Sequence, residues 1–189
     1  GLGVADMKGG CAAMIEAFLC AAKLNKLPES TVLALVVGEE EDGDGTKALL
    51  ETYSFQSAIV AEPTNMIPCF NHYGYIEISV ETYGERRHAA MSRYGSNAIK
   101  AMLHFLLMFD SYIEENEPDT ILNIRDLYSS ESGFAVSDKC SANIDIHIPP
   151  HINTVIYSKF IRNYAEKILK GSSCSDYEIK FPTLADGYK

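Results

Sequence analysis

Residues 74–84 read GYIEISVETYG, and this stretch decides the fold expected for most of the chain. Apolar and polar side chains alternate along it, which predicts a strand with one buried face and one wet face. Apolar residues then recur at three- and four-residue spacing, which predicts a helix over residues 97–115. Strands are expected next near residues 121–128 and 140–148. The pattern up to this point is β-α-β-β.

A second helix and a last strand complete this pattern. Apolar side chains at four-residue intervals predict a helix that ends at Gly171, because glycine commonly follows the last helical turn. The stretch DYEIKF, residues 176–181, predicts the last strand. The order β-α-β-β-α-β predicts a ferredoxin-like sandwich. We assign this domain to residues 71–182 and expect residues 183–189 to return toward the preceding domain.

The first 70 residues have a different pattern. Helix formers predict a helix over residues 8–26 and another over residues 46–53. Two apolar runs, TVLALVV at residues 31–37 and SAIVAEPTN at residues 57–65, predict strands that are covered on both faces. Helices that alternate with such strands predict a parallel α/β sheet, whose ligands gather at the carboxyl ends of the strands. Three acids lie at these ends: Glu39, Glu40 and Glu62.

The composition excludes several classes of partner. The chain has 189 residues, of which 47% are hydrophobic, and this is enough for a real core. Its net charge of −10 argues against nucleic acid, because phosphates require clustered Lys and Arg. Five scattered cysteines without a C-x-x-C pair predict neither a disulfide framework nor a thiolate zinc site, and they fit a reducing cytoplasm. No apolar run is long enough to span a bilayer, so no membrane partner is expected.

The acidic stretch GEEEDGDGTKALLE, residues 38–51, has three readings. An EF-hand calcium loop could begin at Glu40, but such a loop follows a helix and not a strand. A solvated acidic turn explains Asp44 better than it explains Glu39, which lies at the site-forming end of a buried strand. The third reading is part of a catalytic metal site. The calcium loop would use five positions: Glu40, Asp42, Asp44, Gly45 and Glu51.

Four motifs occur in order along the chain: GVADMKGG, VVGEEEDGDGTKALL, AIVAEPTN and GERRHAAMSRYGSNAI. Together they resemble the motif set of the zinc amidohydrolases and metallopeptidases that include acetylornithine deacetylase, succinyl-diaminopimelate desuccinylase, aminoacylase and glutamate carboxypeptidase. The resemblance covers nearly the whole chain. It implies a zinc-binding α/β domain into which a βαββαβ lid or dimerisation domain is inserted. It also implies hydrolysis of amide bonds in N-acyl amino acids or small peptides by a zinc-activated water.

The resemblance implies roles for five residues. Asp6 would bridge two zinc ions, Glu40 would bind one of them, and Glu62 would bind the other. Glu39 would be the general base that takes a proton from the attacking water. His88 would help to stabilise the oxyanion, in some relatives from the partner subunit. The implied cofactor is zinc, two ions per full-length chain, with cobalt or manganese as substitutes.

Asp6 also has a structural reading, and three further residues have two readings each. Asp6 taken alone would be an acid at a helix N-terminus. Asn97 is expected to begin its helix, and a substrate contact is its second reading. Arg86 and Arg87 form either a solvated basic turn or a site that holds an acidic group of the substrate. The register of the general base within residues 39–41 stays open by one position.

The chain also departs from the family pattern. Two zinc-binding histidines that the resemblance implies, one in an H-x-D motif before Asp6 and one near the end of a full-length enzyme, are not among these residues. We therefore expect the 189 residues alone to be inactive, or nearly so. The expected partners are a small N-acyl amino acid or peptide substrate and a second copy bound through the lid. The alternative function is a calcium-binding or metal-free dimerisation or interaction module.

Overall fold

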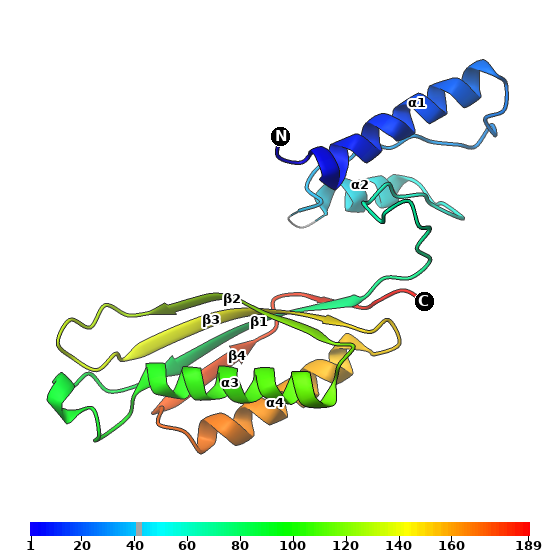
Figure 1. Cartoon of the computed structure of the whole chain (residues 1–189). Coiled ribbons are helices and arrows are strands. Elements are labelled where there is room, and N and C mark those ends of the chain that lie inside the picture. Colours follow the sequence, from blue (N-terminus) through cyan, green and yellow to red (C-terminus); the bar gives the residue numbers. More distant parts are fainter. Residues whose placement is uncertain (41–42) are drawn as a thin grey trace. The chain divides into compact units, whose positions relative to one another are not determined.

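The structure is a computed structural model, and it describes residues 1–40 and 43–189. The chain forms two compact units, Gly1–Cys69 and Phe70–Lys189. Figure 1 shows helices and loops in the first unit and a sheet with two helices in the second. Among the helices of the described residues, none is long and apolar enough to cross a membrane. The chain is a mixed α/β protein.

The second unit is built on an antiparallel sheet. Its strands are β1 (Gly74–Tyr83), β2 (Ile121–Ser129), β3 (Lys139–Ile148) and β4 (Asp176–Lys180), in the spatial order β2-β3-β1-β4. The short β5 (Leu184–Ala185) pairs with the start of β1. The longest pairing joins β1 to β3 over the full length of both strands. The stretch GYIEISVETYG therefore forms a central strand of the sheet.

Two helices lie on one face of this sheet (Figure 1). They are α3 (Ala98–Asn116) and α4 (Thr154–Lys170), and each begins after an asparagine whose side chain caps it. The Oδ1 atom of Asn97 accepts a hydrogen bond from the backbone N–H of Lys100 at 3.0 Å, and Asn153 caps α4 in the same way. Such caps satisfy N–H groups that have no partner inside the helix. The elements follow one another as β1, α3, β2, β3, α4 and β4, which is the predicted order.

The core of the second unit lies between the sheet and these helices. Every second residue of β1 is buried, as the alternation predicts. The opposite face of the sheet carries polar side chains: Arg125, at a β-bulge in β2, contacts Glu77 at 2.6 Å and Asp145 at 3.0 Å. The largest fully buried side chains come from β1, β3 and the two helices, and they include Ile76, Ile78, Phe105, Phe109, Ile144 and Ile161.

The first unit contains both of the helices predicted for it. A π-type turn, η1 (Val4–Lys8), leads into α1 (Gly9–Lys23), and α2 spans Asp44–Thr52. The first helix ends at Lys23 and not at residue 26. Asn25 adopts a left-handed backbone conformation with a φ of 52°, which does not continue a right-handed helix.

The two strands predicted for the first unit are not formed. Residues 31–37 and 57–65 have no strand assignment, and the described part of this unit contains no β-ladder. Val37 is 77% exposed and Ile59 is 84% exposed, although both were expected in a core. A strand needs a neighbour for its N–H and C=O groups, and neither segment pairs with another described segment. The predicted parallel sheet is therefore not confirmed.

The central strand pair offers a test of the core. Ile144, which is fully buried in β3, leaves a cavity under the helices when it is replaced by Ala, so Ile144→Ala should lower the free energy of unfolding by about 2 to 5 kcal/mol. The control Ile156→Ala changes the same residue type at an exposed position of α4 and should cost less than about 1 kcal/mol. Urea denaturation followed by circular dichroism measures both. Equal effects would contradict the assigned core.

Candidate functional site

Asp6 lies in the turn that leads into α1. Its backbone is extended, with φ −119° and ψ 101°; the backbone of Met7 is also non-helical, and the peptide bond between the two residues is cis. The N-cap residue Lys8 makes no side-chain cap, and the first turn of α1 contains no acid. Asp6 makes no side-chain cap, but it lies in the first turn of η1 directly before α1, which agrees with an acid near a helix N-terminus. Its side chain is exposed.

A tight turn presents Glu39 and Glu40 at the end of the extended segment. Behind them, the N–H group of Gly45 donates a hydrogen bond to the carbonyl oxygen of Val37 at 3.1 Å. A Cβ atom at Gly45 would lie 2.6 Å from that oxygen, so only glycine permits the contact. Gly43, with a φ of 65°, turns the chain into α2. Both glutamates are left exposed.

The calcium-loop reading of this stretch disagrees with α2. Asp44 and Glu51 both belong to the helix, and seven residues of helix separate their Cα atoms by about 10 Å. In an EF-hand, the ligands at these two positions meet at one ion. Glu41 and Asp42 lie outside the described residues. The register of the general base within residues 39–41 therefore stays a prediction.

Glu62 lies on a segment that packs against the start of α1. A Cβ atom at Gly10 would lie 2.2 Å from the carbonyl oxygen of Ala61, so the helix and this segment approach each other closely. Only glycine at this position of the first turn permits such an approach. The contact brings Glu62 to the same region as Asp6, although the two residues are far apart in the sequence.

The three predicted metal ligands and the predicted base Glu39 meet in their effect on one group, the carboxyl of Glu62. Burial raises the pKa of Glu62, and the negative charge of Asp6 and a hydrogen bond to it raise the pKa further. The charges of Glu39 and Glu40 act in the same direction. As they stand, no three His, Cys, Asp or Glu side chains of the described residues are close enough together to hold a metal ion. The acids thus share a region of negative charge without forming a coordination shell.

His88 lies in the second unit, in the connection from β1 to α3. It precedes the 3-10 turn η2 (Ala89–Met91), and its Nδ1 atom accepts a hydrogen bond from the N–H group of Ala90 at 3.2 Å. In the neutral imidazole, the proton is therefore on Nε2. The side chain is exposed, so the Nε2–H group can donate to a ligand.

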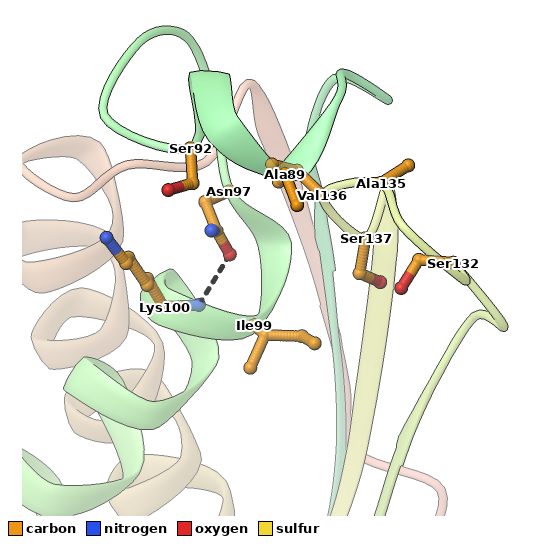
Figure 2. A pocket seen from close by; sticks show the side chains of 9 residues that line it. All are labelled: Ala89, Ser92, Asn97, Ile99, Lys100, Ser132, Ala135, Val136 and Ser137. Carbon is orange, nitrogen blue, oxygen red and sulfur yellow. Dashed lines mark hydrogen bonds between the residues drawn. The ribbon is translucent and has the colours of Figure 1, made fainter.

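An open cavity with a volume of about 370 Å³ lies next to this turn. Figure 2 shows it between the connection from β1 to α3 and the connection from β2 to β3. Asn97 borders the cavity, but its Oδ1 atom caps α3, which leaves its amide NH₂ group for a ligand (Figure 2). The lining contains one cation and, among the described residues, no acid: Ala89, Ser92, Asn97, Ile99, Lys100, Ser132, Ala135, Val136 and Ser137.

Arg86 and Arg87 both make contacts within the protein. The Nη2 atom of Arg86 donates to the carbonyl oxygens of Glu131 at 3.2 Å and of Ser132 at 3.5 Å. Arg87 forms an ion pair with Glu85, to which its Nε atom donates at 2.9 Å. A substrate contact by either guanidinium group stays a prediction.

Comparison with known proteins gives the family. The sequence model of "Peptidase family M20/M25/M40" matches residues 1–185, nearly the whole chain. The chain belongs to this family. The M20 chain is 30% identical over 146 residues to the "Probable succinyl-diaminopimelate desuccinylase" of Staphylococcus aureus strain MSSA476. This match covers 74% of the M20 chain and 36% of the relative, so the chain spans about a third of that relative's length.

Two solved structures share the fold of part of the M20 chain. A hydantoinase/carbamoylase family amidase from Burkholderia ambifaria has a TM-score of 0.55 at 12% identity, over 62% of this chain and 29% of the amidase. A tripeptidase from Staphylococcus aureus has a TM-score of 0.50 at 17% identity, over 64% of this chain and 31% of the tripeptidase. At these identities the likeness concerns the fold alone.

The sequence reasoning misses one part of the M20 chain that borders the His88 turn. This part is the connection from β2 to β3, residues 130–138, and it reads SESGFAVSD, which holds no catalytic or metal-binding motif. It reaches His88 because the end of β1 lies beside the start of β3, where Tyr83 pairs with Lys139. The predicted ferredoxin-like sandwich is thus the signal that could have found it, because in this fold the strands on either side of the connection lie in one sheet with β1.

The raised pKa of Glu62 gives a pH-dependent test on the metal-free M20 chain. A carboxyl group with a raised pKa in the folded state contributes stability below its ordinary pKa of 4.5, and the contribution is lost as the pH rises through the raised value. Glu62→Gln removes the repelled charge, so it should raise Tm at pH 7 and leave Tm unchanged at pH 4. Glu51→Gln, at an exposed position of α2, should match the unmodified chain at both pH values. A lower Tm for Glu62→Gln at pH 7 would contradict the shared negative region.

Proposed function

We propose that the protein to which this chain belongs hydrolyses amide bonds with the help of bound metal ions. Its substrates would be N-acyl amino acids, which lose their acyl group, or small peptides. The close approach of the Ala61–Glu62 segment to the start of α1 carries this proposal, because it brings Glu62 near Asp6. Burial raises the pKa of Glu62, and the charges of Asp6, Glu39 and Glu40 raise it further. Membership of the M20/M25/M40 family and the relative named as a desuccinylase support it.

The four acids have the chemistry that a divalent cation requires. Asp6 is proposed to bridge two zinc ions, Glu40 to bind one of them, and Glu62 to bind the other. A nearby positive charge would oppose the rise in the pKa of Glu62 that burial and the other acids cause. Cobalt or manganese would be accepted as substitutes. When bound, two zinc ions supply Lewis acidity toward water and toward the carbonyl group of the substrate.

Glu39 is proposed as the general base. Its carboxylate would take a proton from the attacking water and later deliver it to the amine that leaves. The task requires an accessible carboxylate without a competing ion pair. Glu39 is exposed, and none of the ion pairs among the described residues includes it. Its neighbour Glu40 is left for the metal.

His88 is proposed to stabilise the oxyanion that develops on the substrate. The N–H group of Ala90 holds Nδ1, so the exposed Nε2–H group is a donor of fixed tautomer. Asn97 is a proposed contact to the substrate because it borders the cavity beside η2. A contact of Arg87 with an acidic group of the substrate would have to compete with its ion pair with Glu85, and the carbonyl bonds of Arg86 favour a role within the protein.

We propose that the second unit is a ferredoxin-like lid inserted into the zinc-binding domain. Its element order, β-α-β-β-α-β, and its strand order, β2-β3-β1-β4, support this assignment. The lid would span residues 71–182, and residues 183–189 would return to the zinc-binding domain. Residues 1–70 would belong to that domain, and their extended segments would join its parallel sheet in the whole protein.

The proposed location is the cytoplasm. All five cysteines are free, which fits a reducing compartment. The acidic chain, with a net charge of −10, offers no large basic face for a nucleic acid.

A second copy of the protein is the proposed partner of the lid. Strand β2 is an edge strand, and α3 lies next to it. Edge strands and exposed apolar patches are usually protected or covered, and two copies related by a two-fold axis can pair their edges into one sheet. A metal-free interaction module, the second candidate function, would use the same surface. Its exposed apolar side chains are Ile124 and Leu127 on β2 and Leu103 and Leu107 on α3.

Substitution of Glu39 in the full-length protein tests the proposed hydrolase. Metal analysis should find about two zinc ions per chain in both the wild type and Glu39→Gln. Turnover of N-acyl amino acids should fall by at least about 100-fold in Glu39→Gln, because the amide cannot accept the proton. Glu51→Gln, an exposed change on α2, should keep full activity. Activity of Glu39→Gln within a few-fold of the wild type would remove Glu39 as the base, and a wild type without metal and without turnover would overturn the hydrolase.

A charge in the exposed patch tests the proposed dimer. Leu107 is 67% exposed, so Leu107→Glu should leave the fold intact and convert a dimeric full-length protein into monomers, because a buried unpaired charge is costly. Ile156→Glu, at a site on α4 that is 69% exposed, is the matched control and should stay dimeric. Sedimentation velocity measures both. A monomeric wild type would argue against pairing through the lid.

A further inference from the structure

The β2–β3 connection, residues 130–138, is bonded to the segment that carries His88. The N–H group of Ala89 donates to the carbonyl oxygen of Phe134 at 2.8 Å. The N–H group of Val136 donates to the carbonyl oxygen of Arg87 at 2.7 Å. The backbone groups on both sides of His88 are therefore tied to this connection. The place at which the imidazole is presented depends on where the connection lies.

The connection is fastened by its own bonds mainly at its base. The Oγ atom of Ser130 donates to the carboxylate of Asp138 at 2.6 Å, and the N–H group of Gly84 donates to the carbonyl oxygen of Asp138 at 2.8 Å. At the tip, Gly133 has a left-handed φ of 56°, and a Cβ atom built there would have no neighbour within 4 Å. The N–H group of Ala135 donates to the carbonyl oxygen of Ser132 at 2.9 Å and closes the turn around Gly133. The bonds to the His88 segment begin at Phe134, so the residues before Gly133 need another contact to lie in one place.

Arg86 supplies a contact close to the tip. Its Nη2 atom donates to two successive carbonyl oxygens, those of Glu131 at 3.2 Å and Ser132 at 3.5 Å. Its charge also reaches the base of the connection. A hydrogen bond from Ser130 lowers the pKa of Asp138, and the charge of Arg86 acts in the same direction. The guanidinium group is thus bonded to the connection at Glu131 and Ser132, between its base and its tip.

We propose that Arg86 is a positioning residue that holds the β2–β3 connection against the His88 segment and so fixes where the imidazole is presented. This role rests on the proposed function, since it assumes that His88 acts in turnover, and it requires no contact between Arg86 and the substrate. The planar guanidinium group can donate to two neighbouring carbonyl oxygens, whereas a lysine ammonium is a single point of charge. Arg87 cannot take over the role, because it is paired with Glu85.

Kinetics of the full-length enzyme separate positioning from substrate binding. Arg86→Ala should lower kcat by about 10- to 100-fold and keep KM within about twofold, because a misplaced group acts on the chemical step. Arg86→Lys should recover part of the loss. The control Arg93→Ala removes the same charge from an exposed site between β1 and α3 and should match the wild type. Unchanged kcat, or a raised KM alone, in Arg86→Ala would overturn the proposal.

A double-mutant cycle tests whether Arg86 acts through His88. In the His88→Ala background, Arg86→Ala should change kcat by less than about twofold, because the group that it positions is already gone. A further loss of about tenfold or more would mean that Arg86 acts independently, which overturns the proposal. An unchanged kcat in His88→Ala alone would remove the oxyanion role from the proposed function. In that case, hydrogen exchange still tests whether Arg86 holds the connection against the His88 segment.

Hydrogen exchange measures the position of the connection without turnover. In Arg86→Ala, the amides of Ala89 and Val136 should exchange about tenfold faster or more. Each of these amides donates a hydrogen bond across the contact between the His88 segment and the β2–β3 connection, so it loses protection when the connection moves away. The amide of Ile78, within the central strand β1, is the internal control and should keep its protection. If Ala89 and Val136 stay as protected as in the wild type, Arg86 does not hold the connection, and the proposal fails whatever the role of His88.

Discussion

The pairing of β1 with β3 is the interaction on which the second unit depends. It runs without interruption from Gly74 opposite Ile148 to Tyr83 opposite Lys139, and it aligns the buried residues of both strands beneath α3 and α4. Since side chains alternate with a period of two, a slip by one residue would turn the apolar set of a strand to the wet face. The same register decides where the two strands stop. The His88 segment begins where β1 ends, at Tyr83, and the β2–β3 connection ends where β3 begins, at Lys139. The pairing of β1 with β3 therefore positions both the core and this part of the candidate site.

The second unit can be predicted from sequence patterns because its elements complete their burial and pairing within the unit. The alternation in residues 74–84 predicts the buried face of a strand, and the apolar stripe of α3 predicts the buried face of a helix. These two faces pack against each other in one core. Residues 31–37 show the limit of this reasoning. Their apolar, β-branched composition is typical of a buried strand, yet a strand is defined by the neighbour that accepts its hydrogen bonds. The described residues of the first unit provide no such neighbour, and local composition cannot reveal that.

For the candidate site, the sequence supplies the residue types and their order, but it does not show which distant segments lie next to them. The cap that Asn97 places on α3 follows from a local rule, because donor and acceptor are three residues apart. The effect of Asp6 on the pKa of Glu62 depends on the close approach of Gly10 to another segment, which no local pattern encodes. The contacts of Arg86 across the β2–β3 connection are of the same kind. They exist because two strands that are not consecutive in the sequence are neighbours in the sheet.

Main-chain hydrogen bonds join the His88 segment to the β2–β3 connection, and we call this set of bonds the seam. Because the seam uses main-chain groups, the side chains along it are freer to differ among relatives. Every residue type except proline carries both a main-chain donor and an acceptor, so a substitution at Phe134 or Val136 need not break the seam. Phe134 is 89% exposed, and few internal contacts constrain its identity. The side chain at position 134 can therefore change during evolution while the bonded scaffold beneath the imidazole is retained.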